Sequence, residues 1–451
     1  MNNDYLYICK SMRKLFCIIC GILAVCAAYG QSFLESVNLS LDKGFEGVYA
    51  KGETVKVFAD VEKDTPALVK VYLNGKFMSV RETMLPAGKS EVFSGSYDEA
   101  AALMIRIANP SDQNDSTTVG AIVAPEDFRP GFEEPADFCR FWRKQLRKMR
   151  RQKMNVKLTP VEIPGDDGEK YVCYDLEINC LSFRPVRGYL AMPRDAGPRS
   201  LPIAIYAHSA GELTASYTKA TVKKAVSLAK SGNGAIALDI NAHGILNGQD
   251  DAYYEAMQKE LDHYSSWPVT DHESFYFRGM FLRMVRALDY LCTLKEWDRE
   301  RVLVTGGSQG GAQSAALAGL DSRVKMVVVD VPAMWDMGGI LLGRTSSWTK
   351  PLEREGIDSP AARIMPYYDA ANFMRHYKGE LVVNVGLIDL TCPPASVWSV
   401  FNVCAASSKT IHPCSWKGHS GKYSVPTKEG RAEMKKLMGN YLDDAINSYL
   451  Q

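Results

Sequence analysis

From about residue 125 to the C-terminus, apolar runs of strand length alternate with stretches of helical spacing. Such alternation is typical of a mostly parallel sheet covered by helices on both faces, because each buried strand returns through a crossover helix. The predicted strands are Tyr171 to Ile178, Arg187 to Met192, Ile203 to Ala207, Ala235 to Ile240, Val302 to Thr305, Val324 to Val329, Leu381 to Val385 and Lys409 to His412. The predicted helices include Pro135 to Met149, Phe275 to Leu294, Gly310 to Leu320 and Pro394 to Cys404. Residues 124–451 are therefore expected to form an α/β domain with a doubly wound sheet.

Residues 31–123 have another pattern, made of short strands and turns. The runs Thr54 to Val61 and Leu68 to Leu73 alternate with period two, and the turn signal Asn74-Gly75 follows the second run. Short strands without a long helix predict a small β-sandwich, with the immunoglobulin-like type as the first interpretation. We expect an accessory domain that acts as a spacer or lid, or that binds carbohydrate. The length of 451 residues exceeds the ~250–300 residues at which single hydrophobic cores stop growing, so a division of the chain into two domains is expected.

The first 30 residues have the features of an export signal. Basic residues at positions 10, 13 and 14 precede the apolar run Leu15 to Ala28, which is too short to span a bilayer stably. Small residues at Ala28 and Gly30 predict cleavage before Gln31 and an exported periplasmic or extracellular protein without stable membrane insertion. The alternatives are a lipoprotein anchored at Cys26 and a retained anchor.

The net charge and the cysteine count limit which partners, disulfides and metal sites this chain is expected to have. The formal net charge is only +1, so no whole-chain field attracts polyanions, and we expect no nucleic-acid partner. Four of the eleven cysteines lie in the expected leader, and the odd remainder cannot form a complete set of disulfides. Buried free thiols are the favoured interpretation over a metal site. The pairs Cys173 with Cys180 and Cys404 with Cys414 remain open for an oxidising compartment.

The run Gly306-Gly307-Ser308-Gln309-Gly310-Gly311 lies between a predicted strand and a predicted helix. A serine at such a corner is held in a strained backbone conformation with its hydroxyl exposed above the sheet. The glycines around it let the strand and the helix pass closely. Ser308 is therefore the candidate nucleophile of an α/β-hydrolase-type site, the alternative being a glycine-rich structural turn.

A serine nucleophile needs a base, and an acid followed by a histidine is expected later in the chain. Asp389 follows the strand ending in Val385, and His419 lies in the small-residue loop Lys417 to Gly421. We predict Asp389 and His419 as catalytic partners of Ser308. Asp330, which ends the strand after the nucleophile's helix, is the rival acid. The rival histidines include His412, interpreted as structural, and His376, placed at a surface junction.

The oxyanion of the intermediate needs two donors. The amide of Gln309 is the first, and the amide of Ala210, in the loop after the strand Ile203 to Ala207, is the predicted second, with Ser209 as the alternative. His208 and His243 are predicted as candidates for lining the substrate pocket. A hydrogen-bonded loop histidine is the competing interpretation for His208.

From Pro125 to the C-terminus the chain resembles acetyl xylan esterases and cephalosporin-C deacetylases, the seventh carbohydrate-esterase family. The matching segments are Phe128 to Phe138, Gly306 to Gly311, Asp330-Val331-Pro332, and Gly386 to Asp389 with Cys392-Pro393-Pro394. The resemblance implies metal-free deacetylation of sugar or related esters, without a cofactor, through Ser308, His419 and Asp389. The resemblance is also compatible with a homo-oligomer. This chain departs from the family pattern at Ala210, at Asn241 to Gly244 and at Ser420.

Two other functions compete with an esterase acting on small-molecule or oligosaccharide esters. A serine peptidase of the prolyl-oligopeptidase kind has the same catalytic order but would need a propeller-length N-terminal region. A carbohydrate-binding protein with a vestigial elbow would leave Ser308 unreactive.

Overall fold

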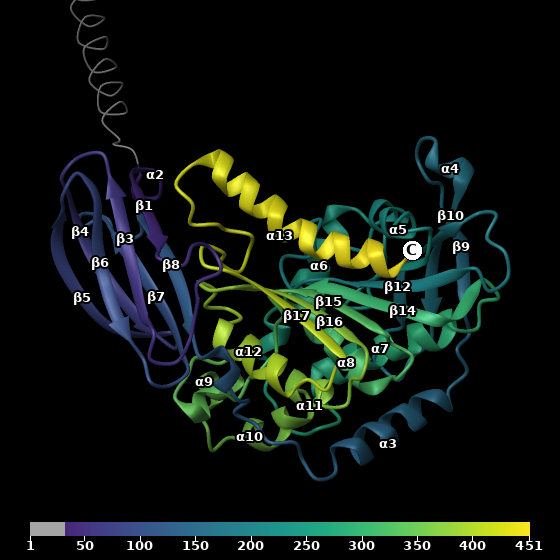
Figure 1. The fold of residues 1–451 in the computed structure, drawn as a ribbon. Helices are drawn as coiled ribbons and strands as arrows, with labels where there is room; N and C mark the ends of the chain where they lie inside the picture. The colour runs from purple at the N-terminus through teal and green to yellow at the C-terminus, as the bar shows by residue number, and fades with distance from the viewer. Residues whose placement is uncertain (1–31) are drawn as a thin grey trace, which may run out of the picture.

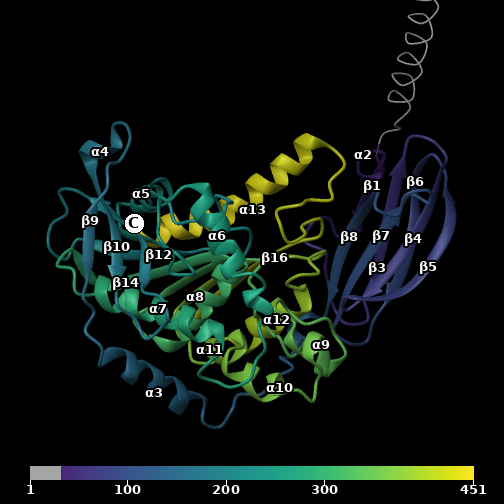
Figure 2. The same ribbon diagram turned by 180° about the vertical axis from the view of Figure 1, so that it is seen from behind.

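The fold is that of a computed structural model, which describes residues 32–451. The expected signal peptide, residues 1–30, lies outside the described residues. Figure 1 shows a β-rich part at the N-terminal end beside a larger part in which helices surround a long sheet, and Figure 2 shows the same arrangement from behind. Within residues 32–451, none of the helices combines the length and apolar character that a membrane crossing requires.

Two small sheets make up the N-terminal part. One has the order β1-β3-β6 and the other β2-β8-β7-β4-β5, and their strands pair antiparallel except for β2 with β8. Strand β3 buries Val55, Val57 and Ala59 and exposes the residues between them, as period two requires. Both sheets contribute to one hydrophobic cluster. The elements are α2 (Phe33–Ser36), β1 (Val37–Leu41), β2 (Val48–Tyr49), β3 (Thr54–Val61), β4 (Thr65–Leu73), β5 (Lys76–Leu85), β6 (Gly88–Ser96), β7 (Ala101–Ala108) and β8 (Ser116–Val123).

The larger part is built on a nine-stranded sheet of order β17-β16-β15-β14-β12-β13-β11-β10-β9. From β13 to β17 the strands are parallel, whereas β9, β10 and β11 pair antiparallel at the other edge. The predicted mixed α/β fold with a large, mostly parallel sheet is confirmed. The strands are β9 (Lys157–Pro160), β10 (Tyr171–Ile178), β11 (Val186–Pro193), β12 (Leu201–Ala207), β13 (Ile236–Ile240), β14 (Trp297–Gly307), β15 (Met326–Asp330), β16 (Glu380–Gly386) and β17 (Ser408–Cys414).

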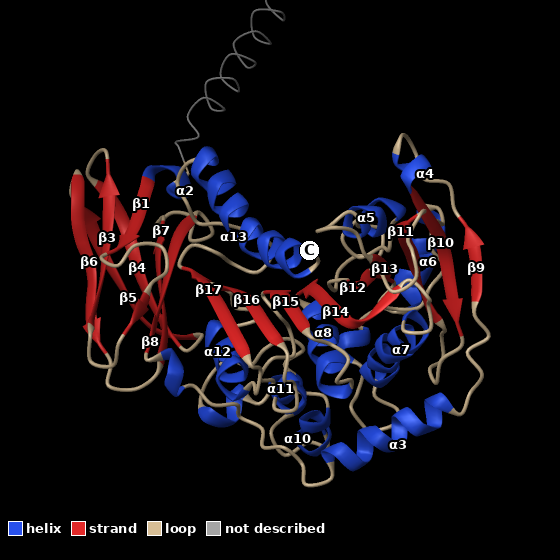
Figure 3. Cartoon of the chain, turned by 45° about the vertical axis from the view of Figure 1, so that its right-hand side comes forward, coloured by secondary structure: helices blue, strands red, loops and turns tan. Residues whose placement is uncertain are grey.

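Helices cover both faces of this sheet, as Figure 3 shows. Helices α5 and α13 lie on one face, and α7, α8, α11 and α12 lie on the other. Because side chains alternate along a strand, Val302 and Val304 of β14 join the hydrophobic cluster on the α8 side, whereas Leu303 joins the α5 side. The helices are α3 (Phe138–Arg150), α4 (Asp167–Lys170), α5 (Val222–Ala229), α6 (Asp251–Glu260), α7 (Tyr276–Leu291), α8 (Gln309–Leu320), α9 (Pro351–Glu355), α10 (Ala361–Ile364), α11 (Ala370–Met374), α12 (Pro394–Val403) and α13 (Lys428–Tyr449).

Candidate active site

Ser308 stands at the corner between β14 and α8. Its φ of 51° and ψ of −118° are unusual for a residue other than glycine. Four backbone hydrogen bonds hold this conformation: the Ser308 amide donates to the carbonyl of Asp330 at 2.9 Å, and the Ser308 carbonyl accepts from the amides of Gly311, Ala312 and Ala333 at 2.8, 3.3 and 2.9 Å. The surrounding structure therefore stabilises a conformation that the serine alone would avoid.

The glycines of the corner are required by a close approach to β12. A Cβ added at Gly306 would lie 2.5 Å from the carbonyl oxygen of Ala207, and one added at Gly310 would lie 2.2 Å from the same atom. Neither separation is compatible with van der Waals radii. Helix α8 can therefore begin beside the end of β12 only because these positions lack side chains.

His419 and Asp389 meet Ser308 above the sheet edge. Ser308 Oγ lies 2.9 Å from His419 Nε2, and His419 Nδ1 lies 2.8 Å from Asp389 Oδ2. The Asp389 side chain is completely buried, and the His419 side chain is 20% exposed. The other carboxylate oxygen of Asp389 accepts from the amides of Thr391 and Cys392 at 2.8 and 2.9 Å. The structure thus joins the three predicted residues in one hydrogen-bonded chain.

The rival acid, Asp330, has a different partner. Its Oδ1 forms an ion pair with the Nζ of Lys417, which is nearly fully buried, two residues before His419. Asp330 and Lys417 therefore connect β15, the strand beside β14, to the start of the loop that carries His419. Sequence reasoning did not single out Lys417, although its place directly before Gly418-His419 is a signal that could have been used.

The rival histidines also have other partners. His412 lies within β17, and its ring stacks on that of Tyr441 with centroids 3.9 Å apart and an interplanar angle of 3°. His376 Nε2 lies 2.9 Å from Glu134 Oε1, at the junction between α11 and β16. His419, rather than either of them, contacts the Ser308 hydroxyl.

The predicted oxyanion donors belong to two segments that the sheet places side by side. Gln309 is the first residue of α8, and Ala210 lies in the loop after β12, whose Ala207 is in register with Gly306 of β14. Ser209, the alternative donor, uses its hydroxyl to bond the carbonyl of Gly307 at 2.9 Å. That bond attaches the loop after β12 directly to the corner between β14 and α8.

His208 is a buried residue of this loop with a hydrogen-bond partner at each ring nitrogen. Its side chain is 2% exposed, with Nε2 lying 2.5 Å from Asp239 Oδ1 and Nδ1 lying 2.9 Å from the carbonyl oxygen of Tyr217. The other oxygen of Asp239 accepts from the Thr221 amide at 2.8 Å. Both ring nitrogens of His208 therefore have a hydrogen-bond partner within the protein. These contacts are those of a hydrogen-bonded loop histidine, the competing interpretation, and a place for this ring in the substrate pocket stays a prediction.

His243, the second predicted pocket residue, is also buried. Its Nδ1 lies 2.7 Å from the hydroxyl oxygen of Tyr276, and its ring contacts Tyr264 edge-on. Tyr264 in turn donates to the side-chain oxygen of Gln309. Burial, with smaller contributions from Arg283 and Arg184, lowers the pKa of His243 to about 3, so the ring is neutral near pH 7. His243 is therefore connected to Gln309 only through Tyr264, and its place in the substrate pocket stays a prediction.

The N-terminal sheets contact the segments that carry the acid and the histidine. The Gly120 amide of β8 donates to the carbonyl of Ser415 at 2.8 Å, and the indole of Trp416 donates to the carbonyl of Leu39 at 3.1 Å. A Cβ added at Gly120 would lie 2.4 Å from the carbonyl oxygen of Leu387, two residues before Asp389. Sequence reasoning missed this contact.

Two groups of side chains in residues 32–451 could hold a metal ion. One comprises Asp389, Cys392 and His419, and in it Asp389 and the Nδ1 atom of His419 are already bonded to each other. The other comprises Glu134, Cys139 and His376. All seven described cysteines are free, and only Cys139 among them is exposed.

Comparisons with known proteins identify the family of this chain. The family model described as acetyl xylan esterase (AXE1) matches residues 125–429. The acetyl esterase Axe7A of Xylanibacter ruminicola is 29% identical over 337 residues, which cover 72% of this chain and 73% of that protein.

Two solved structures show a likeness of fold. The acetyl xylan esterase from Paenibacillus sp. R4 has 23% identity and a TM-score of 0.54, covering 70% of this chain and 98% of its own. Acetyl xylan esterase 1 from Thermoanaerobacterium sp. JW/SL YS485 has 19% identity and a TM-score of 0.50, covering 70% of this chain and 97% of its own.

Proposed function

This chain belongs to the acetyl xylan esterase family, and we propose that it removes acetyl or other short acyl groups from carbohydrate esters through Ser308, His419 and Asp389. It is a carboxylic ester hydrolase. The observation that carries the catalytic assignment is the hydrogen-bonded chain from the Ser308 hydroxyl through His419 to Asp389, with distances of 2.9 and 2.8 Å. The natural substrate is proposed to be a small-molecule or oligosaccharide ester.

The chemistry begins with proton transfer from Ser308 to His419. With Nδ1–H donated to Asp389, the Nε2 atom of His419 has a free lone pair and accepts the hydroxyl proton as Oγ attacks the ester carbonyl. The buried carboxylate of Asp389 stabilises the imidazolium that forms. The same proton then goes to the leaving sugar oxygen as the carbon–oxygen bond breaks, which leaves an acyl group on Ser308.

Deacylation repeats these steps with water. His419 takes a proton from water, the hydroxide adds to the acyl carbonyl, and Ser308 leaves with the proton that His419 returns. In both halves the negative charge on the carbonyl oxygen is held by the amides of Gln309 and Ala210, with Ser209 as the alternative second donor. We propose that His208 is a positioning residue, because its bonds to Asp239 and Tyr217 hold the loop that carries Ala210.

We propose that residues 31–123 form a separate β-sandwich domain of the immunoglobulin-like type, followed by a catalytic domain over residues 124–451. The two N-terminal sheets share a hydrophobic cluster of their own, which supports the division, and only Ala102 and Ile122 of their buried residues join the main cluster of the larger part. The contacts of Gly120 with Ser415 and Leu387 support a role for this domain as a brace for the loops that carry His419 and Asp389.

Replacing Gly120 with alanine tests the brace. The added Cβ would displace the Leu387 carbonyl or the β8 strand, so we expect a loss of about 1–3 kcal/mol in the free energy of unfolding. We also expect a lower kcat for p-nitrophenyl acetate, because the displaced segment leads into Asp389. Gly197→Ala is the matched control, since an added Cβ there meets nothing within 4 Å. A Gly120→Ala variant with the kcat and melting temperature of the control would refute the brace.

Export remains a proposal that rests on residues 1–30, with a periplasmic or extracellular location for the product and a lipoprotein anchored at Cys26 as the alternative. N-terminal sequencing of the protein recovered from a producing cell checks it, because cleavage before Gln31 requires an N-terminus at that residue. An intact Met1 or Met12 would contradict export by cleavage.

A comparison of substrates tests the proposed function. We expect release of acetate from an acetylated xylo-oligosaccharide. We expect little or no cleavage of a chromogenic dipeptide substrate, whose scissile bond is an amide. The screen extends to feruloylated and longer-chain esters, because the size of the acyl pocket sets the acyl length. Amide cleavage without deacetylation would favour the peptidase, and tight binding of the oligosaccharide without turnover would favour a vestigial site.

A further inference from the structure

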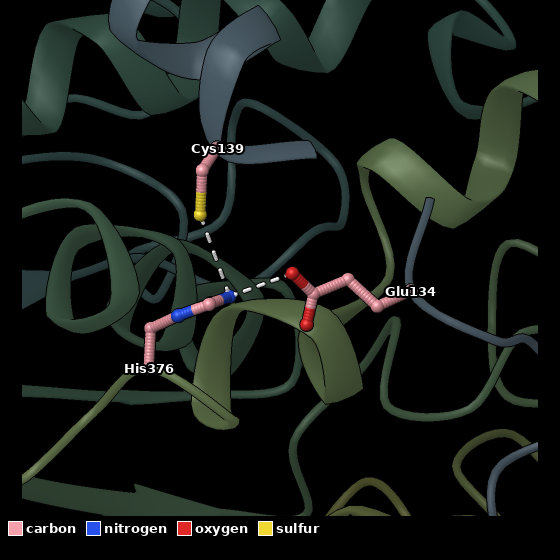
Figure 4. A group of neighbouring side chains, drawn as sticks. All are labelled: Glu134, Cys139 and His376. Carbon is pink, nitrogen blue, oxygen red and sulfur yellow. Dashed lines mark hydrogen bonds and ion pairs between the residues drawn. The ribbon is translucent and has the colours of Figure 1, made fainter. Parts of the chain in front are cut away.

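Three side chains of metal-binding type meet at the surface near the start of α3 (Figure 4). Glu134 precedes the helix, Cys139 lies in its first turn, and His376 lies between α11 and β16. The Nε2 atom of His376 is 2.9 Å from Glu134 Oε1 and 3.7 Å from Cys139 Sγ. All three possible ligand atoms lie within 4.8 Å of one another. One imidazole nitrogen therefore faces a carboxylate and a thiol at the same time.

The neighbouring residues hold these side chains in place. The ring of His376 stacks on that of Phe138, with centroids 5.8 Å apart and an interplanar angle of 7°. Phe138 is itself buried and packs against Phe373. Helix α3 is attached to the same region by the indole of Trp142, which donates to the carbonyl of Tyr367 at 2.9 Å. The orientation of the imidazole and the place of Cys139 are thus set by the core beneath them.

We propose that Glu134, Cys139 and His376 form a zinc-binding site. One sulfur, one nitrogen and one oxygen suit Zn²⁺, whereas Ca²⁺ and Mg²⁺ prefer oxygen ligands alone. In a tetrahedral zinc site the nitrogen lies about 3.5 Å from a sulfur ligand and about 3.4 Å from an oxygen ligand. The nitrogen–sulfur pair already has nearly this spacing, and the nitrogen–oxygen pair needs to open by about 0.5 Å.

The charges also balance. On binding, the Cys139 thiol releases its proton to solvent, so a thiolate and a carboxylate together neutralise the two positive charges of the ion. Cys139 is exposed, and the side chains of His376 and Glu134 are 36% and 28% exposed. Water can therefore supply the fourth ligand.

The site is separate from the proposed catalytic residues. His376 comes before β16, whereas Asp389 comes after it, and a strand of this length spans about 20 Å. A bound ion would cross-link the segment that leads into α3 to the α11–β16 junction, so we assign it a stabilising role. This inference goes beyond the proposed esterase function and does not depend on it.

The test is a titration of the chelator-treated full chain with Zn²⁺, followed by calorimetry and by the melting temperature. We expect Zn²⁺ to raise the melting temperature of the wild-type chain. Cys139→Ser and His376→Gln should each weaken Zn²⁺ binding by about 100-fold or more, because losing a ligand costs at least as much affinity as losing a residue that only hydrogen-bonds to a ligand. Co²⁺ serves as the spectroscopic probe, because a thiolate ligand adds a charge-transfer band that Cys139→Ser should abolish. His263→Gln removes a histidine whose side chain is 82% exposed and is the matched control.

Two outcomes would refute the proposed zinc site. Absence of saturable Zn²⁺ binding by the wild-type chain is one of them. Binding that survives both Cys139→Ser and His376→Gln but is lost in His419→Gln would place the ion at Asp389, Cys392 and His419 instead. Esterase activity of Cys139→Ser should equal that of the wild type without metal, so a failure of the zinc proposal and a failure of the catalytic proposal give different results.

Discussion

Ser308→Ala is expected to lower kcat/KM for p-nitrophenyl acetate by about 10⁴-fold or more, the scale of loss when a serine nucleophile is removed. Without Oγ there is no atom to form the acyl-enzyme, and the remaining rate comes only from binding and oxyanion stabilisation. A fluorophosphonate probe should label the wild-type chain at Ser308 and fail to label the variant.

The fold should survive this change. Alanine keeps the Cβ of serine at a φ of 51°, and the four hydrogen bonds that hold the corner are all made by backbone atoms. Glycine would be a poor choice, because it would relax the strained conformation as well as remove the hydroxyl. The melting temperature and near-ultraviolet circular dichroism check the fold, with Ser322→Ala, at an exposed turn, as the matched serine control. Activity or probe labelling retained at wild-type level in Ser308→Ala would disprove the nucleophile.

Asp389→Asn is expected to lower kcat by about 10⁴-fold, comparable to the tautomer effect known for serine hydrolases. The reason lies in the other contacts of this side chain. Because one oxygen of Asp389 accepts from the amides of Thr391 and Cys392, the oxygen of an asparagine should keep that position. Its NH₂ group would then face His419 Nδ1. The imidazole would carry its proton on Nε2, where it can no longer accept the proton of Ser308.

Asp330→Asn is the companion variant, and it separates the two candidate acids. It removes the charge that pairs with the buried Lys417, so we expect a lower melting temperature but a much smaller loss of kcat than in Asp389→Asn. Steady-state kinetics of the two variants on the same ester, at a temperature where both remain folded, make the comparison. If Asp330→Asn lost as much kcat as Asp389→Asn, the assignment of the acid would be wrong.

The strand-to-helix corner at Ser308 was accessible from the sequence because its determinants are local. A buried strand, two glycines and a small-residue helix lie within one short stretch, and the structure shows β14, Ser308 and α8 in that order. The large parallel sheet could be expected for a similar reason, since apolar runs of strand length repeat between helical stretches. The order of the strands had no such signal, because it is set by how the faces of the sheet pack.

The sequence predicted Asp389 as the acid and kept Asp330 as its rival, so the choice between them depended on more than local pattern. Both follow adjacent parallel strands, β15 and β16, so both reach the same edge of the sheet. Only the path of the loop after β17 determines that His419 faces Asp389 while Lys417 faces Asp330. The role of His208 was open in the same way, since its partner Asp239 lies on a different strand.

The sequence by itself thus determined the α/β class, the place of Ser308 and the order of serine, acid and histidine, because short-range patterns encode strands, helices and tight corners. Only the tertiary structure decided which acid meets the histidine, how the N-terminal sheets support the segments near Asp389 and His419, and that Cys139 meets His376. Cys139 and His376 lie 237 positions apart, and their contact depends on the packing of α3 against the α11 region. Contacts at such separation follow from the burial of whole surfaces, which no local pattern of residues specifies.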